Sequence, residues 1–168
     1  MSASDVRKNF NIFVDGRGYA GQATEFNAPK LSLKMEEFRG GGMDGTVEIP
    51  VGMEKMNSDF ALVKYDADVI ALFGITKGAE KSITVYETLE SFDGSATPIV
   101  HSMTGRITEL DPGASKPGTI PELKASLALS YYKLTHGTTI VHEIDVPNMV
   151  RTINGVDQLA EQRKNLGM

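Results

Sequence analysis

The sequence contains no cysteine, no tryptophan and only three histidines among its 168 residues. The lack of cysteine excludes disulfides, thiol nucleophiles and thiolate metal sites together. No stretch reaches the ~18 consecutive apolar residues that a membrane-spanning helix requires, and the N-terminal residues lack the apolar core of a secretory signal peptide. Lys and Arg (17) are outnumbered by Asp and Glu (22), giving a formal net charge of −5. A basic surface that grips DNA phosphates is therefore not expected.

The remaining composition is that of one folded domain. Hydrophobic side chains make up 40% of the 168 residues, which is enough to bury a core. No shift in composition, low-complexity tract or internal repeat divides the chain. We therefore predict a single domain over residues 1–168.

Alternation of apolar and polar side chains dominates the sequence and predicts strands with one buried face. It is clearest at 30–36, 47–51 and 81–90, and long strands are expected at 97–110 and 122–135. One face of the last strand is expected to carry its large apolar side chains, which are Leu123, Leu127, Leu129 and Tyr131. The chain is thus rich in strands that need a common core.

Turn and cap residues complete this outline. An Asp15-Gly16 turn after the apolar strand 10–14 predicts a hairpin whose returning strand occupies 19–26. Two short helices are expected, one at 66–73 with Asp66 as its cap. The other lies around 155–166, with Asn154 as its cap and Gly167 at its end. The predicted fold class is mainly β with two short helices, as a β-sandwich or a barrel.

Two glycine-rich segments could suggest phosphate or nucleotide binding. Gly16, Gly18 and Gly21 match the spacing G-x-G-x-x-G, but a dinucleotide site needs a helix directly after the glycines. Residues 22–30 contain Pro29 and no helical stripe, so a glycine-rich hairpin turn is the interpretation we adopt. The second segment, 40–45, lacks the Gly-Lys-Ser/Thr ending of a phosphate loop.

No catalytic or metal-binding arrangement is recognisable. His101, His136 and His142 have neither metal-ligand spacing nor an H-E-x-x-H pattern. Neighbouring carboxylates such as Glu36 and Glu37 point to opposite faces of a strand, which opposes a general acid–base pair. Asp66 and Asp68 lack the further oxygen donors of a calcium loop, and Asp66 is explained as a cap. We predict no enzyme, no cofactor and no metal.

Several segments, taken in order, resemble one known family. They are NIFVDG at 11–16, YAG at 19–21, PKL at 29–31, EEFRGGGMDG at 36–45, SYYKL at 130–134, EID at 143–145 and RTINGVDQL at 151–159. Together they resemble the major tail tube proteins of contractile-tailed bacteriophages, and the tube proteins of R-type bacteriocins share the pattern. The resemblance covers nearly the whole chain.

The resemblance implies a structural subunit of the inner tail tube. Six copies would form a ring whose sheets close one ring-wide β-barrel, and rings would stack into a hollow tube. The tail sheath would surround the tube, with a baseplate or spike initiator and a tail terminator at its ends. Sheath contraction would drive the tube through the host envelope, and DNA would pass down the lumen without specific binding. The protein would be a virion component that is synthesised in the host cytoplasm.

Two sets of residues are candidates for assembly roles. A hairpin arm around 38–58 would join neighbouring subunits, because its glycine-rich tip can become ordered on contact. The tip residues are Arg39, Gly40, Gly41, Gly42, Met43, Asp44 and Gly45. The candidates for the lumen wall are Ser82, Thr84, Thr88, Glu90, Glu122, Lys124, Ser126 and Ser130. The helix around 155–166 would form an outer or inter-subunit surface.

Two alternatives stay open. A bacteriocin or secretion-like tube without DNA would share every feature above. A small-ligand or nucleotide-binding β domain would instead use the glycines at 16–21.

Overall fold

A computed structural model describes residues 3–75 and 79–168 of the chain. The strands are β1 (Val6–Val14), β2 (Arg17–Gly18), β3 (Ala23–Asn27), β4 (Leu33–Phe38), β5 (Val47–Met53), β6 (Met56–Leu62), β7 (Lys81–Glu90), β8 (Ala96–Asp111), β9 (Leu123–His136), β10 (Thr139–Asp145), β11 (Val150–Ile153) and β12 (Val156–Asp157). The helices are α1 (Ala67–Ile70) and α2 (Ala160–Asn165). The prediction of a mainly β fold with two short helices is confirmed.

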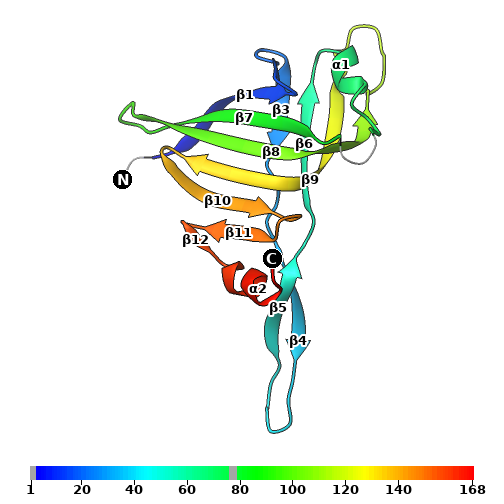
Figure 1. Ribbon diagram of the computed structural model, residues 1–168. Coiled ribbons are helices and arrows are strands. Elements are labelled where there is room, and N and C mark those ends of the chain that lie inside the picture. Colours follow the sequence, from blue (N-terminus) through cyan, green and yellow to red (C-terminus); the bar gives the residue numbers. More distant parts are fainter. Residues whose placement is uncertain (1–2, 76–78) are drawn as a thin grey trace.

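One large antiparallel sheet contains ten of these strands (Figure 1). Its order is β12-β11-β10-β9-β8-β7-β1-β2, with β6 and β3 branching from β9. The branch arises because β9 pairs with β6 over its first half and with β10 over its second half. Strand β9 is therefore the central strand, to which both the β6–β3 branch and the β10–β11–β12 part of the sheet are paired.

The branch curls around the core to form an incomplete barrel. Strand β3 returns towards β1, where the rings of Phe10 and Phe26 lie 6.4 Å apart. The segment between β2 and β3 bridges the gap, since Tyr19 donates its backbone N–H to Ile12 and Val63 donates to the segment's Gln22. Alternating side chains of β1, β6, β7, β8 and β9 fill the interior, as the sequence pattern predicted.

A bulge in β9 changes which side chains reach the core. Thr104 pairs with Tyr131 and Gly105 pairs with Leu129, so Ser130 is an extra residue in the ladder. The extra residue reverses the alternation beyond it. Consequently Tyr132 is buried with 3% exposure, and the prediction that Tyr131 shares the face of Leu127 is wrong.

The chain that follows the first turn differs from the prediction. Asp15 and Gly16 have φ values of 50° and 81° and form the expected hairpin turn. However, the returning strand β2 has two residues, and the next strand, β3, pairs with β6 rather than β1. The predicted continuous return over 19–26 is therefore wrong, because the chain leaves β1 to close the barrel.

The turn at Asn154 corrects a second prediction. Asn154 and Gly155 have φ values of 49° and 81° and connect β11 to β12, so Asn154 does not cap a helix. Helix α2 begins later, with Leu159 at its cap position and no side-chain cap. Asn-Gly is the strongest short hairpin signal, and here it outweighs the sparse apolar stripe that suggested a helix. Gly167 ends α2 in a left-handed conformation, as expected.

Strands β4 and β5 form a separate two-stranded sheet that projects from the body as an arm (Figure 1). The arm runs from Leu33 to Met53, so it starts before residue 38 and ends before residue 58, the bounds predicted from the sequence, and Met56 already belongs to the main sheet. Every residue of β4 is exposed. The prediction that these strands are half-buried is thus wrong for a single chain.

Candidate assembly site

The residues that might have carried chemistry have structural roles. Gly16 lies in the β1–β2 turn, Gly18 in β2 and Gly21 in the segment after it, and the next element is strand β3 rather than a helix. Within residues 3–75 and 79–168, no three His, Asp or Glu side chains are placed to hold a metal. No helix in these ranges is long and apolar enough to span a membrane.

His101 belongs to a buried polar network in the core. Its ring is 3% exposed, with Nε2 2.9 Å from Glu87 and Nδ1 3.0 Å from the hydroxyl of Tyr132. Phe26 covers the ring edge-on at 5.3 Å. Burial, followed by the charge of Glu87, raises the pKa of Tyr132 to about 12. The network gives the buried ring nitrogens of His101 and the hydroxyl of Tyr132 hydrogen-bond partners.

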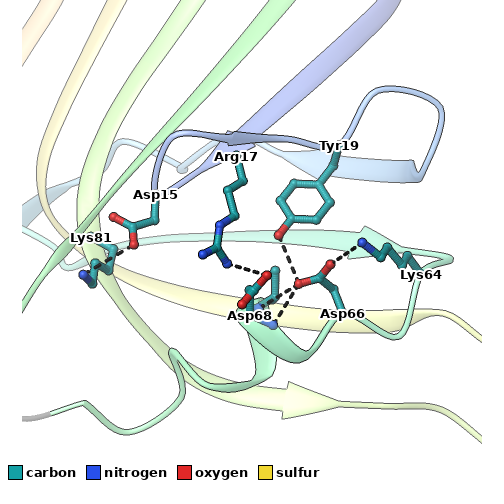
Figure 2. A network of polar contacts seen from close by, with 8 residues as sticks. Asp15, Arg17, Tyr19, Lys64, Asp66, Asp68 and Lys81 are labelled. Atoms are coloured by element: carbon teal, nitrogen blue, oxygen red, sulfur yellow. Dashed lines mark hydrogen bonds and ion pairs between the residues drawn. The ribbon is translucent and has the colours of Figure 1, made fainter.

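A second network joins the β1–β2 hairpin to α1 (Figure 2). Asp66 accepts hydrogen bonds from the backbone N–H groups of Asp68 (2.9 Å) and Val69 (3.2 Å), which confirms it as the helix cap. It also accepts one from the buried hydroxyl of Tyr19 at 3.2 Å and lies 2.7 Å from the ammonium of Lys64. That ammonium and the helix N–H groups lower the pKa of Asp66.

The remaining ion pairs of Figure 2 argue against a calcium site at this place. Asp68 pairs with Arg17, and Asp15 lies 3.4 Å from Lys81. The carboxylates thus point to separate cations rather than to one shared centre. The network fixes the hairpin against α1, and the helix ends at Ile70, before the predicted Phe73.

The predicted tip residues, 39–45, all lie in the loop that joins β4 to β5. Arg39 donates from Nε to the carbonyl of Met43 at 3.1 Å, and Gly42 adopts a φ of 85° that favours glycine. No atom outside the immediate chain neighbours lies within 4 Å of a Cβ built on Gly41, Gly42 or Gly45. The tip is therefore an open turn that has room for a contacting surface.

Register shows that the arm carries apolar side chains on both faces. Directly opposed residues in an antiparallel pair share a face. Phe38 opposes Val47 on one face, beside Ile49, and Met35 opposes Pro50 on the other. Met35 is 40% exposed, Ile49 44% and Phe38 52%. A two-stranded ribbon is marginal by itself, and exposed apolar patches mark interaction sites, so both faces are candidate contacts.

Two adjoining hollows lie where the arm meets the body. One has a volume of about 320 Å³ and lies between the arm's root and strands β10 and β11. The other, of about 430 Å³, extends towards α2. They share the side chains of Met53, Ile144 and Arg151. Each chain therefore presents a projecting arm and, at its base, a largely apolar recess.

The candidate lumen residues lie on the side of the sheet that faces away from the core. Ser82, Thr84, Thr88 and Glu90 alternate with buried residues along β7. On β9, Lys124 and Ser126 directly oppose Asp111 and Glu109 of β8, which are exposed on the same side of the sheet. Ser130 differs, because its hydroxyl lies within hydrogen-bond distance of two acceptors, the carboxylate of Glu80 and the carbonyl of Thr104. Glu122 precedes β9 in an exposed loop.

The sequence-based candidates on the arm are the tip residues 39–45, whereas the exposed apolar side chains of the folded arm lie along β4 and β5. The signal was available, because two alternating runs flank the glycines without a third strand to cover them. Arg151 was also missed as a residue of the recess. It has no sequence signature, since β10 and β11 bring it to the arm's root only in the folded chain.

Comparison with known proteins agrees with this architecture. The model of the family described as phage tail tube protein FII matches residues 6–167. The tail tube protein of Escherichia phage P2 is 32% identical over 167 residues, which cover 96% of each chain. The major tail tube protein of Serratia phage KSP20 is 29% identical over 147 residues, covering 87% of this chain and 85% of that one.

Solved structures show a similar fold. A chain from the sheath-tube complex of the PVC extracellular contractile injection system, in its extended state, matches with a TM-score of 0.58 and 14% identity. The match covers 75% of this chain and 87% of that one. A chain from the sheath/tube terminator structure of the same system matches with the same score and covers 92% of its own length. The chain belongs to the phage tail tube protein FII family, and is thus a structural tail tube protein of contractile-tailed phages, a virion component and not an enzyme.

Proposed function

We propose that six copies of this chain form a ring and that the rings stack into a hollow tube, with the arm joining neighbouring copies. One observation carries the proposal: beyond its root, where Met53 packs against the core, the arm exposes apolar side chains on both faces. Burying such side chains removes apolar surface from water, which is the dominant favourable term in association. The arm's natural partner is therefore another copy.

The ends of the main sheet support closure of the ring. The main path of the sheet ends at β2 and β12, which have two residues each. Strand β2 pairs only with Phe13 and Val14 of β1, so most of the outer edge of β1 has no partner strand among the described residues, and β12 is itself an edge strand. Unpaired edges invite pairing with another strand. Pairing between neighbouring copies would join six curved sheets into one ring-wide barrel without free edges.

We further propose that the solvent-facing side of β7, β8 and β9 lines the lumen. The candidate wall residues are polar, and acidic residues outnumber basic ones in the whole chain. A weakly acidic bore would repel DNA phosphates, so the genome could slide without specific binding. Lys124 works against this charge balance. The electrostatic potential in an experimentally determined ring tests the idea, and a net positive bore would contradict it.

In this proposal the tube has the partners of a contractile tail. A sheath surrounds it, a baseplate or spike initiator and a terminator occupy its ends, and contraction drives it through the host envelope. The subunit is synthesised in the host cytoplasm, which suits a chain without cysteine. The likeness to chains from a sheath-tube complex and a sheath/tube terminator supports this assignment at the level of the fold.

A contractile device without DNA is the second candidate, because two solved structures of similar fold come from an extracellular contractile injection system. Capsid and terminase genes beside this gene would indicate a phage, whereas lysis and tail genes alone would indicate a bacteriocin. Equilibrium dialysis with NAD and ATP tests the remaining ligand-binding alternative, and specific binding of either would favour it.

Negative-stain electron microscopy of the purified protein tests the proposal directly, with rings or tubes as the expected result. Exchange of Gly41 and Gly42 for valine should block tubes and leave a folded monomer, because Gly42 requires a left-handed backbone and both sites are otherwise open. Gly118→Val is the matched control, since Gly118 has a φ of 80° outside the arm. Normal tubes from the arm variant would refute the role of the arm.

A further inference from the structure

The smaller recess at the arm's root contains an unpaired cation. Its wall consists mainly of apolar side chains from the arm's root and from β10 and β11, and Arg151 is its one arginine, lysine or carboxylate. Arg151 makes no side-chain hydrogen bond or ion pair with any described residue. The buried Nδ1 of His142, in the same wall, also lacks a hydrogen-bond partner there. A half-buried guanidinium in an apolar wall favours an anionic partner.

The arm carries an unpaired pair of anions. Glu37 and Glu48 oppose each other directly across the β4–β5 ladder, so their carboxylates share a face. Like charges in this position destabilise a strand pair. Neither carboxylate forms an ion pair with a cation of the described chain. The apolar Met35 and Pro50 lie next to them on the same face.

The arm cannot bring these carboxylates to the recess of its own chain. Leu33, at the base of β4, lines that recess. Glu37 is four residues further along the strand, which is roughly 13 Å at 3.3 Å per residue. A contact between these carboxylates and Arg151 therefore requires a different copy, and a projecting arm beside a recess is the arrangement of a head-to-tail contact that repeats.

We infer that the Glu37–Glu48 pair of one copy binds Arg151 in the recess of a neighbouring copy, while Met35 and Pro50 fill the apolar part of that recess. Arg151 also borders the larger recess, which fits less well because it already contains the carboxylates of Glu54 and Asp145 and the ammonium of Lys55. The contact deepens the proposed tube function and rests on it. It also leaves the opposite face of the arm, with Phe38 and Ile49, free to meet a further copy.

Charge reversal tests the contact. Arg151→Glu alone, and Glu37→Lys with Glu48→Lys, should each lower the yield of sedimentable tubes at least tenfold. The triple variant, which reverses both sides, should restore tubes, and so should an equimolar mixture of the two defective proteins. Glu36→Lys is the matched control, because Glu36 lies on the other face of the same strand. If Glu36→Lys lowers the tube yield, adding Arg151→Glu should not restore it.

The readouts are tube yield by pelleting, tube structure by electron microscopy, and folding of each variant by circular dichroism and size-exclusion chromatography. Should Arg151→Glu fail to fold, Arg151→Met keeps most of the side-chain volume, and its tubes should be fewer and less sensitive to salt. Wild-type yields from both Arg151 variants, or a triple variant no better than its parents, would overturn the contact and leave the tube function standing. Failure of the wild-type protein to form rings or tubes would instead contradict the proposed function.

Discussion

Replacing Asp66 by alanine removes one carboxylate that four groups share. It caps α1 through two backbone N–H groups, accepts from the buried hydroxyl of Tyr19 and lies beside the ammonium of Lys64 (Figure 2). Alanine can replace none of these bonds. The hairpin that begins the barrel closure would lose its attachment to α1.

The structure sets the size of the effect. Loss of a side-chain cap costs about 1 kcal/mol, and a buried hydroxyl left without a partner costs about 1–3 kcal/mol. The pair with Lys64 adds little, because half of that lysine side chain is exposed. The expected decrease in the free energy of unfolding is therefore about 2–4 kcal/mol, which corresponds to roughly 10 °C in melting temperature for a domain of this size.

Urea unfolding of monomeric protein, followed by circular dichroism, measures this quantity. Asp68→Ala is the matched control, two residues away, because its pair with Arg17 is exposed on both sides and should contribute little. Tyr19→Phe should show a smaller loss than Asp66→Ala, since the cap stays. Equal destabilisation by the Asp66 and Asp68 variants would refute the reasoning, because burial would then not distinguish the two carboxylates.

Gly105→Ala should destabilise the monomer by about 1–3 kcal/mol, because a Cβ there would meet the backbone carbonyl of Ala128 across the bulge; Gly41→Ala, with no atom within 4 Å, should leave urea unfolding unchanged. Acid should also destabilise the fold. The cationic partners of Asp66 and Asp157 lower the pKa values of these carboxyls in the folded chain. The two carboxylates therefore contribute their full stabilisation of the fold above the unfolded pKa of about 4, and this contribution is lost as the pH falls through the lower folded pKa values. The melting temperature should therefore drop below about pH 4, and less steeply in Asp66→Asn; equal slopes would contradict the role of Asp66.

Local sequence patterns were sufficient to predict an element when all its buried side chains face the same core. The strand predicted at 81–90 has the same bounds as β7, since its alternation is uninterrupted and both its neighbours lie in one sheet. The cap at Asp66 was equally local, because an aspartate before an apolar stripe specifies a helix start. These elements needed no knowledge of the rest of the chain.

Other features depend on contacts that no local pattern contains. The bulge at Ser130 lies where the partner of β9 changes from β6 to β10, and beyond it Tyr132 rather than Tyr131 is buried. The alternation in the arm correctly predicts two strands. It also predicts a buried face, but in a single chain no core covers the apolar side chains of these strands. The recess around Arg151 combines residues from both halves of the sequence, so only the folded chain reveals it.

The way the arm is rooted determines how it responds to force. Both of its strands continue into the neighbouring strands β3 and β6, and the arm extends roughly along the direction of β6 (Figure 1). Strand β6 is paired with β9 along its whole length, from Met56 to Leu62. A pull on the arm therefore loads this ladder in shear, so its hydrogen bonds must fail together, whereas a peeling force would break them one at a time. Traction on the arm is thus carried into the centre of the sheet before any strand can separate.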